Sequence, residues 1–419
     1  MSTELGIGRA LGGVAATAWL AVAAHRLSIT NFGRLTLVLS LGSLVSIGTD
    51  LGIPLALAKL SCDHDELDKR VFAGAVRRRA QAGLAAAVLL VALWVNAGHG
   101  SMWWLAALYG VSIVVSPVTS SFMALLRGKG SGAIEAGYEL FSKIVLLSAG
   151  IAVLAAGKGV TGAMAVYVLV DSGSAVVVPL LVRRQVRFSD TPDPTQHEEL
   201  RLRQTLPLAA GGIVGSAYER IDIWLMALLL GSTGVALYAV AYKLYDTLLM
   251  PAKAIASSAV AAAGKGVIQD GKKVATRLAA KTLMVTVPLA AVAAAWAPSI
   301  IRAGFGGHFG RSDNALRILA ATAVPGAVLA VITPIALLRR RRMIVAWTAA
   351  GLVGNIAANL ILVPTVGVAG ASIAFLITET GLMVVFWISL SMPVSPPKPL
   401  GRPIDVTEPP TGYPAAPRP

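Results

Sequence analysis

The segment GVTGAMAVYVLVDSG at residues 159–173 recurs 208 positions later as GVAGASIAFLITETG at residues 367–381. Both copies begin with glycine, carry an acidic residue at the same point (Asp171 or Glu379), and continue into a further uncharged apolar stretch. Each copy with its continuation exceeds the length of about 20 residues that crosses the hydrocarbon core of a bilayer. A helix satisfies its own backbone groups in that medium. The repeat therefore predicts two similar halves, each ending in a membrane-spanning helix.

Apolar segments of similar length occur along the whole chain. Of its 419 residues, 56% are hydrophobic and 14% are charged, and the mean hydropathy is +0.72. Soluble domains carry more charge than this. The run LAAAVLLVAL at 84–93 lacks the period-two alternation of a barrel strand. We therefore expect an all-α polytopic membrane protein with about twelve transmembrane helices. Their expected ranges are 10–30, 34–58, 79–98, 102–126, 134–156, 160–182, 204–230, 234–262, 277–300, 314–338, 343–363 and 366–391.

A polar central loop divides these helices into two groups of six. It contains two prolines and many charges, RRQVRFSDTPDPTQHEELRLR. The predicted organisation is a first bundle at 1–182, a linker at 183–203, a second bundle at 204–391 and a disordered proline-rich tail at 392–419. Two six-helix halves in the same orientation imply a pseudo-twofold axis along the membrane normal.

A second, weaker match supports the duplication. FGRLTLVLSLGSLVSIGTD, which begins at Phe32, aligns with VALYAVAYKLYDTLLMPAK, which begins at Val235. This alignment places Asp50 opposite Lys253. It makes the second span of one half equivalent to the second span of the other.

Basic residues are distributed unevenly between the two sets of loops. Alternate loops and the two termini contain 26 of the 36 Lys and Arg residues, the opposite loops contain six, and four lie inside spans. Because cytoplasmic loops are enriched in these residues, the bias predicts an inner-membrane protein with both termini in the cytoplasm. The same loops explain the net charge of +15, so we expect no nucleic-acid partner. The single cysteine, Cys62, excludes an intramolecular disulfide.

Four stretches resemble the polysaccharide-export and lipid-linked oligosaccharide flippases (Wzx-like) of the multidrug/oligosaccharidyl-lipid/polysaccharide (MOP) superfamily. They are NFGRLTLVLSLGSLVSIGTDLGIPLALAK at 31–59, YERIDIWLMALLLGSTGVALYAVAYKLYDTLLMP at 218–251, FGGHFGRSDNALRILAATAVPG at 305–326 and NIAANLILVPTVGVAGASIAFLITETG at 355–381. The stretches sample both halves, so the resemblance covers the whole chain. Its most specific features are the Asp-Leu-Gly at 50–52 and the Gly-x-x-Gly-Ala at 367–371.

This resemblance implies two six-helix bundles arranged as a V around a polar cavity. It implies a transporter, not an enzyme, that moves polyprenyl-diphosphate-linked sugars from the cytoplasmic to the outer leaflet by alternating access. The implied partners are the lipid-linked glycan, membrane lipid, and glycosyltransferases or a polymerase of the same pathway. The chain lacks an acid in its first span that would suit the cation coupling of the multidrug branch, and it lacks the two extra spans of the peptidoglycan-precursor flippases. Two alternatives stay open: a cation-coupled drug antiporter of the same fold, and a membrane scaffold for glycan-assembly enzymes.

Charged residues inside spans are costly and therefore suggest function. In the eighth span, Tyr242, Lys243, Asp246 and Lys253 fall on one helical arc. They predict either a cavity wall that meets phosphate or sugar, or a buried ion pair. In the seventh span, the planar guanidinium of Arg220 suits a diphosphate, and a structural ion pair with a neighbouring helix is the alternative. The remaining candidate substrate-binding residue is Asp222, on another face of the same span.

Three further acids are candidates for ion coupling or for structural contacts. Asp171 and Glu379 lie at equivalent places in the last span of each half, and Asp50 lies near the end of the second span. In the fifth span, Glu139 and Lys143 have the spacing of an intrahelical ion pair.

We find no nucleophile elbow, phosphate loop or zinc motif in the sequence, so we expect no catalysis and no cofactor. The cluster CDHDE at 62–66 contains metal-ligand residue types without a partner motif, and we predict no metal site there.

Overall fold

The computed structural model describes residues 2–262 and 267–392, and these residues are almost entirely helical. The helices are α1 (Ser2–Arg26), α2 (Ile29–Ile47), α3 (Ile53–Asp63), α4 (Lys69–Trp94), α5 (Trp103–Gly128), α6 (Gly132–Ala155), α7 (Gly159–Val182), α8 (Pro194–Glu199), α9 (Leu202–Leu248), α10 (Met250–Ala262), α11 (Val267–Ala295), α12 (Ala297–Phe305), α13 (Asp313–Val366) and α14 (Val368–Ser391). Two three-residue strands, β1 (Glu66–Asp68) and β2 (Arg187–Ser189), complete the regular structure, together with short helical turns at 95–102 and 307–312.

Two of the helices contain two spans each. Gly231 interrupts α9 with a φ of 68°, and Arg340 interrupts α13 with a φ of −147° and a ψ of 50°. Within the described residues, nine segments are long and apolar enough to cross a membrane. The helices α1 and α4 and the second part of α9 bring the number of spans to twelve, which confirms the predicted fold class. Three predicted spans are divided: 34–58 between Ile47 and Ile53, 234–262 at Leu249, and 277–300 at Trp296.

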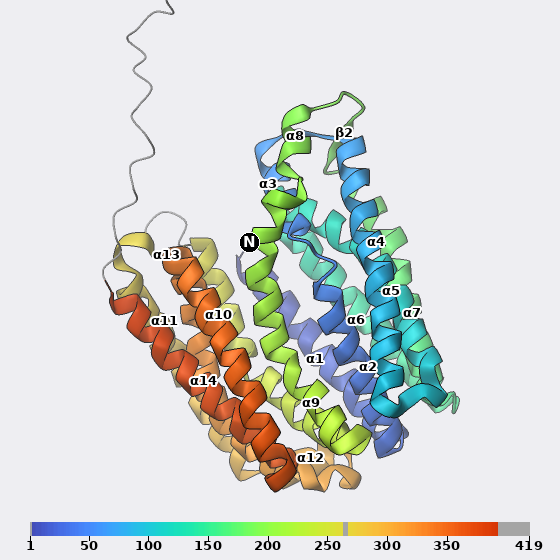
Figure 1. Cartoon of the computed structure of the whole chain (residues 1–419), viewed down its shortest axis with the longest axis vertical. Coiled ribbons are helices and arrows are strands. Elements are labelled where there is room, and N and C mark those ends of the chain that lie inside the picture. Colours follow the sequence, from blue (N-terminus) through green and yellow to red (C-terminus); the bar gives the residue numbers. More distant parts are fainter. Residues whose placement is uncertain (1, 263–266, 393–419) are drawn as a thin grey trace, which may run out of the picture.

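The spans form two lobes that lie side by side (Figure 1). The first lobe contains α1 to α7 and the second contains α9 to α14. The helices α1 and α2 of the first lobe pack against α9 and α10 of the second. The surface between the lobes is therefore built mainly from the first two spans of each half.

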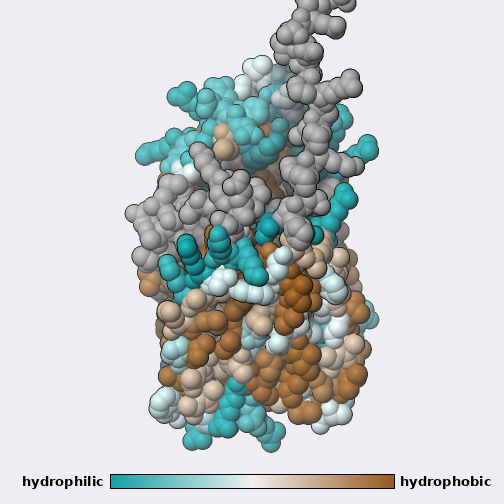
Figure 2. Space-filling model, turned by 90° about the vertical axis from the view of Figure 1, so that its left-hand side faces the viewer, coloured by the Kyte–Doolittle hydropathy of each residue, from teal (hydrophilic) through white to brown (hydrophobic). Residues whose placement is uncertain are grey.

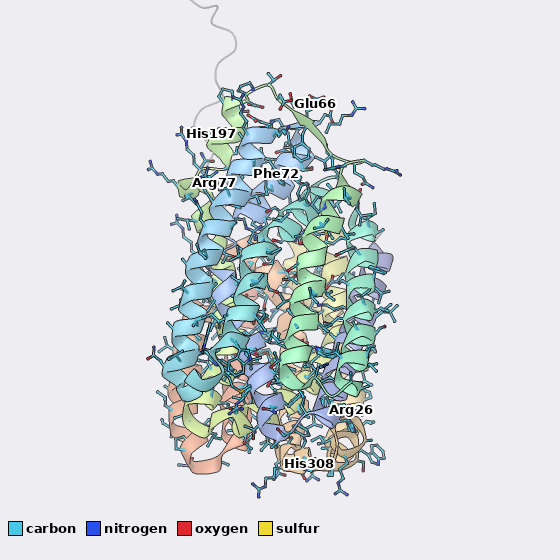
Figure 3. The ribbon with its side chains drawn as sticks, turned by 90° about the vertical axis from the view of Figure 1, so that its right-hand side faces the viewer. Arg26, Glu66, Phe72, Arg77, His197 and His308 are labelled. Atoms are coloured by element: carbon cyan, nitrogen blue, oxygen red, sulfur yellow. The ribbon has the colours of Figure 1, made fainter. Side chains whose placement is uncertain are left out.

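The molecule has a polar end and an apolar band. A belt of hydrophobic side chains covers the lower part of the face in Figure 2, and hydrophilic side chains gather above it and in a smaller patch below. Glu66, Phe72, Arg77 and His197 lie at one end of the bundle, and Arg26 and His308 lie at the other (Figure 3). We call the end that carries β1, β2 and α8 the linker end.

The repeat inferred from sequence recurs in backbone geometry. Gly159 and Gly367, which are equivalent in the alignment, have φ angles of +60° and +69°. Each directly precedes or begins a helix of 24 residues. A positive φ favours glycine because other residues carry a Cβ. Gly162 and Gly370, three positions later, both lack room for a Cβ against the preceding segment. The two halves therefore share the same turn before their last span.

The predicted linker loop is more ordered than its composition indicates. Strand β2 pairs in parallel with β1, with Phe188 opposite Leu67. The Gln196 side chain of α8 accepts a hydrogen bond from the backbone N–H of Asp68 (2.9 Å) and donates one to the carbonyl of Glu66 (3.2 Å). The linker is thus attached to the first lobe over most of its length.

Asp68 stabilises this attachment. Its carboxylate accepts hydrogen bonds from the backbone N–H groups of Asp193, Arg70 and Val71. Burial alone would raise the pKa of Asp68, but these donors hold the pKa below its usual value. Because the folded pKa is the lower one, the carboxylate stabilises this unit at neutral pH. That contribution is lost as the pH falls through the folded pKa.

The lobes are in close contact at the end opposite the linker. The rings of Phe32 from the first lobe and Phe309 from the second meet edge to face, with centroids 5.3 Å apart. Both side chains are buried. At Gly33, an added Cβ would overlap the backbone carbonyl of Ser232. This end of the surface between the lobes is therefore closed.

Candidate functional site

A cavity of about 280 Å³ lies between the two lobes. The first lobe contributes residues of α1, α2, α5, α6 and α7, and the second contributes residues of α9. The polar and aromatic side chains that line it are Trp19, Thr36, Ser40, Ser43, Tyr109, Lys143, Tyr167, Arg220, Tyr242, Lys243 and Asp246. We call this space the interlobe cavity.

Three cations face the interlobe cavity, one from the first lobe and two from the second. Lys143 lies on α6, and Arg220 and Lys243 lie on α9. In the described part of the chain, no hydrogen bond or ion pair joins the guanidinium of Arg220 to another residue, and no ion pair joins Lys143. These two charges lie where an anion between the lobes would meet them.

Two other basic residues, Lys243 and Lys253, differ from Arg220 and Lys143 because both pair with Asp246. Its carboxylate lies 3.4 Å from the ammonium of Lys243 and 2.6 Å from that of Lys253. The ion pair that the sequence offered as one alternative is therefore present, and it is shared between two lysines. The cluster retains one net positive charge. Tyr242 lines the same wall, so the arc predicted for the eighth span does face cavities.

A second cavity, of about 600 Å³, lies within the second lobe between α9, α10, α13 and α14. Arg220, Tyr242 and Asp246 line both cavities. Lys253 and Glu379 line only the second, and Glu379 is 7% exposed.

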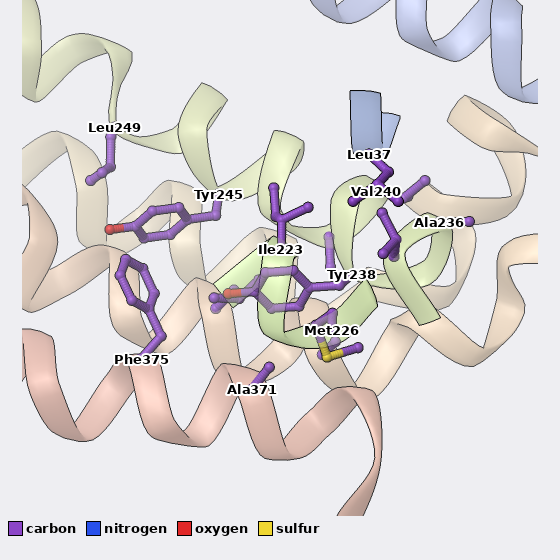
Figure 4. Close-up of a cluster of buried hydrophobic side chains, with 14 of the residues drawn as sticks. Leu37, Ile223, Met226, Ala236, Tyr238, Val240, Tyr245, Leu249, Ala371 and Phe375 are labelled. Atoms are coloured by element: carbon purple, nitrogen blue, oxygen red, sulfur yellow. The ribbon is translucent and has the colours of Figure 1, made fainter. Parts of the chain in front are cut away.

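Aromatic side chains form the wall between the second cavity and the core. Tyr245 and Phe375 pack edge to face with centroids 5.4 Å apart, and Figure 4 shows them together beside Leu249. Gly326 makes room here, because a Cβ on it would lie 2.6 Å from the hydroxyl of Tyr245. The Glu379 carboxylate lies close to the same glycine.

Asp222 occupies a different environment from the other candidate residues. It lines neither cavity and is buried inside the second lobe. Its carboxylate accepts hydrogen bonds from the hydroxyl of Tyr238 (2.9 Å) and the amide of Asn359 (3.1 Å). The network continues through Asn355, whose amide donates to the hydroxyl of Thr378. The side chain of Asp222 points toward α13. Residue spacing within the seventh span alone could not predict this contact.

The remaining two candidate acids lie in the first lobe. Asp50 is at the turn between α2 and α3 and pairs with the guanidinium of Arg79. Asp171 is half-buried on α7, one turn from Tyr167 in the interlobe cavity. Although the two acids are equivalent in the repeat, Glu379 lines the second cavity and Asp171 lines neither of the two cavities.

Several residues of the interlobe cavity were not among the sequence candidates. Lys143 was expected to pair with Glu139, but no such ion pair occurs in the described residues, and Lys143 lines the cavity. The aromatic residues Trp19, Tyr109 and Tyr167 come from three different helices of the first lobe. A lysine inside an apolar span was the one available signal; the aromatic residues gave none.

Comparison with solved structures identifies the fold. The inward-facing conformation of a multidrug resistance MATE family transporter of the MOP superfamily aligns over 91% of this chain and 93% of that one, at 16% identity, with a TM-score of 0.65. The inward closed conformation of the lipid II flippase MurJ aligns over 93% and 87%, at 12% identity, with a TM-score of 0.77. A MOP superfamily transporter from Pyrococcus furiosus aligns over 94% of both chains, at 17% identity, with a TM-score of 0.58. No curated protein sequence matches the chain.

The two lobes of six spans and these alignments define a multi-pass membrane protein with the fold of the MOP superfamily transporters. Residues 6–261 also match the model of the polysaccharide biosynthesis protein family. The match covers more than half of the chain, and the chain belongs to that family.

Proposed function

We propose that the protein moves a polyprenyl-diphosphate-linked oligosaccharide from the cytoplasmic to the outer leaflet by alternating access. The observation that carries this proposal is a pair of cations that line the interlobe cavity from opposite lobes, Lys143 from the first and Arg220 from the second. Neither cation has an ion-pair partner among the described residues. The family match to polysaccharide biosynthesis proteins supports a glycan as the cargo.

The chemistry of the cavity suits the head group of such a lipid. A diphosphate that enters the cavity loses part of its hydration, and fixed cations offset that loss through charge-assisted contacts. Trp19, Tyr109, Tyr167 and Tyr242 offer flat apolar faces for sugar rings together with polar edges. Because Lys143 belongs to one lobe and Arg220 to the other, a bound anion would contact both.

The test is reconstitution of the full-length protein into vesicles that contain a fluorescent polyprenyl-diphosphate oligosaccharide. We expect it to accelerate the appearance of the glycan in the opposite leaflet, measured by a lectin or by chemical quenching. Efflux of cationic dyes without glycan movement would identify a drug antiporter instead. A protein that moves neither cargo would act as a scaffold. Within the proposed pathway, glycosyltransferases or a polymerase are the expected partners.

We further propose that the linker end and both termini lie in the cytoplasm of an inner membrane. Cys62 is exposed at the end of α3, so it reports which side this end occupies. A membrane-impermeant maleimide should label Cys62 in inverted vesicles and leave it unlabelled in intact cells stripped of their outer layers. In a Cys62→Ser background, a cysteine at Gly304 of α12 should show the reverse pattern. Labelling of Cys62 from outside would contradict this orientation.

The shared ion pair predicts an asymmetric response to mutation. Asp246→Ala should lower protein abundance severalfold, because it leaves Lys243, whose side chain is only 19% exposed, as a partly buried charge without its partner. Lys243→Ala alone should leave abundance near wild type, since Asp246 keeps Lys253. Removing Lys243 together with Asp246 should restore abundance. Immunoblotting of membranes measures all three, and normal abundance of Asp246→Ala would show that the pair does not stabilise the fold.

A further inference from the structure

The interlobe cavity and the second cavity are neighbours that share one wall. Arg220, Tyr242 and Asp246 line both of them. The interlobe cavity has a volume of about 280 Å³, and the second cavity has a volume of about 600 Å³. The larger space therefore lies directly behind the side chains that meet the head group of the substrate in the proposed function.

Tyr242 is the aromatic member of this shared wall, and contacts within the second lobe hold it in place. Its hydroxyl donates a hydrogen bond to the backbone carbonyl of Glu219 (3.2 Å). Its ring packs against three other rings, with centroids 5.8, 5.5 and 5.9 Å away, and Figure 4 labels these three residues: Tyr238, Tyr245 and Phe375. The ring of Tyr242 therefore forms a partition between the two cavities.

Tyr242 is also the uncharged member of the shared wall. The carboxylate of Asp246 is paired with Lys243 and Lys253, and the guanidinium of Arg220 meets the diphosphate in the proposed function. A substitution of either charged residue alters the charge of both cavities. A substitution of Tyr242 by a smaller uncharged residue alters the size of the partition and leaves the charge of both cavities unchanged.

The second cavity contains hydrogen-bonding groups that a hydrocarbon chain could not satisfy. The carboxyl groups of Glu219 and Glu379 and the ammonium of Lys253 line it, and Glu379 is only 7% exposed. An ionised carboxyl group accepts hydrogen bonds, a protonated one also donates, and a hydroxyl group can serve both. A prenyl chain beside Glu379 would exclude water from its carboxyl group without replacing the lost hydrogen bonds, which costs free energy. The lining thus favours a ligand that is rich in hydroxyl groups.

Aromatic rings complete the lining of the second cavity. Tyr218, Tyr245 and Phe375 all contribute rings to it. An aromatic ring offers a flat apolar surface, and a tyrosine adds a hydroxyl group. Gly326 keeps space beside these rings, because a Cβ on it would lie 2.6 Å from the hydroxyl of Tyr245 and 3.4 Å from the carboxylate of Glu379. Rings and carboxyl groups together match the apolar faces and the hydroxyl groups of sugars.

We propose that the second cavity is a subsite for the distal sugars of the glycan and that Tyr242 controls access to it. This inference rests on the proposed function and names the class of cargo, a glycan of several sugars. The sugar next to the diphosphate stays in the interlobe cavity. The sugars further from the diphosphate enter the second cavity past Tyr242, once its ring turns away from Glu219. The size of the side chain at position 242 then sets how well a long glycan is carried relative to a short one.

Two substrates of different length test this inference. The full-length protein would be reconstituted into vesicles that contain a polyprenyl diphosphate carrying either a fluorescent monosaccharide or a fluorescent pentasaccharide with the same first sugar. The measured quantity is the rate for the pentasaccharide divided by the rate for the monosaccharide. We expect Tyr242→Ala to raise this ratio at least threefold, because the connection between the cavities widens. Tyr242→Phe keeps the ring and is the matched control, with a smaller increase. Equal increases for the two variants would show that the ring is not the barrier.

Filling the second cavity should change the ratio in the opposite direction. Ala330 lines only the second cavity, and Ala239 lines only the interlobe cavity. We expect Ala330→Phe to lower the ratio at least threefold, whereas Ala239→Phe should slow both glycans alike. Membrane abundance would be measured for each variant. If Ala330→Phe does not accumulate in the membrane, Thr348→Phe fills the same cavity in its place.

The outcomes separate the subsite from the proposed function. If the wild-type protein moves neither glycan, the proposed function is wrong. If it moves both glycans and the ratio responds neither to Tyr242→Ala nor to Ala330→Phe, only the subsite is wrong. An equal loss of both glycans in Ala330→Phe at normal abundance would also overturn the subsite, because the second cavity would then hold a part that both substrates share, such as the prenyl chain.

Discussion

Arg220→Ala is expected to reduce glycan movement at least tenfold while leaving protein abundance near wild type. The guanidinium lines both cavities and is joined to no ion-pair partner in the described residues, so its removal leaves no carboxylate unpaired. A charge-assisted hydrogen bond contributes about 1.5–3 kcal/mol, and each 1.4 kcal/mol corresponds to roughly a factor of ten. The loss should therefore appear in transport and not in folding.

Two further variants make this result interpretable. Arg220→Lys keeps the charge but loses the planar fork that matches phosphate oxygens, so we expect partial activity. Arg302→Ala removes an exposed cation of α12 that lines neither cavity, and we expect normal transport. The assay is the outer-leaflet pool of lipid-linked glycan, measured together with membrane abundance. Normal transport by Arg220→Ala and by Lys143→Ala would rule out the cationic cavity.

Arg79→Ala should produce the largest loss of stability among the charged residues described above. The side chain is 1% exposed. Its guanidinium donates hydrogen bonds to the carbonyls of Thr49 (3.3 Å) and Pro117 (3.2 Å) and to the hydroxyl of Ser121 (2.7 Å), and it pairs with Asp50. Breaking a buried network of this kind costs about 3–5 kcal/mol.

Thermal unfolding in detergent, followed by tryptophan fluorescence, measures this effect. We expect a clearly lower midpoint for Arg79→Ala, and a decrease for Asp50→Ala as well, because the loss of Asp50 leaves the guanidinium of Arg79, which is 1% exposed, without its counter-charge. Arg77→Ala, at an exposed position of the same helix, is the control and should unfold like wild type. Equal midpoints for Arg77→Ala and Arg79→Ala would show that the buried guanidinium does not hold the break between α2 and α3.

The sequence predicted the fold well because hydrocarbon imposes strong constraints. The length of the apolar segments and their lack of period-two alternation predicted membrane-spanning helices, and the repeat at 159 and 367 predicted two similar halves. The structure confirms both predictions. Divided helices were harder to place. Gly231 joins two spans within one long α9, and the break at Leu249 is marked only by Pro251 in the first turn of α10.

The candidate site was predicted only in part, because its geometry depends on helices that are distant in sequence. The arc through Tyr242 and Asp246 could be read from one helix, and it faces the cavities. Asp222 has partners on α13, and Lys143 meets α9 only across the gap between the lobes. The strands β1 and β2 span three residues each, which is too short for a periodic pattern to appear.

The pairing of β1 with β2 also determines how the lobes are joined mechanically. Strand β2 and Gln196 are fixed to the first lobe. Only the short segment from Leu200 to Leu202, where α9 begins, then connects this attached part to the second lobe. Under the proposed alternating access, this short connection would act as a pivot and not as a slack tether. Extra residues inserted into the exposed turn at 190–192 would leave the proposed motion of the lobes unchanged. The same insertion beside Arg201 would lengthen the pivot and uncouple the movement of the two lobes.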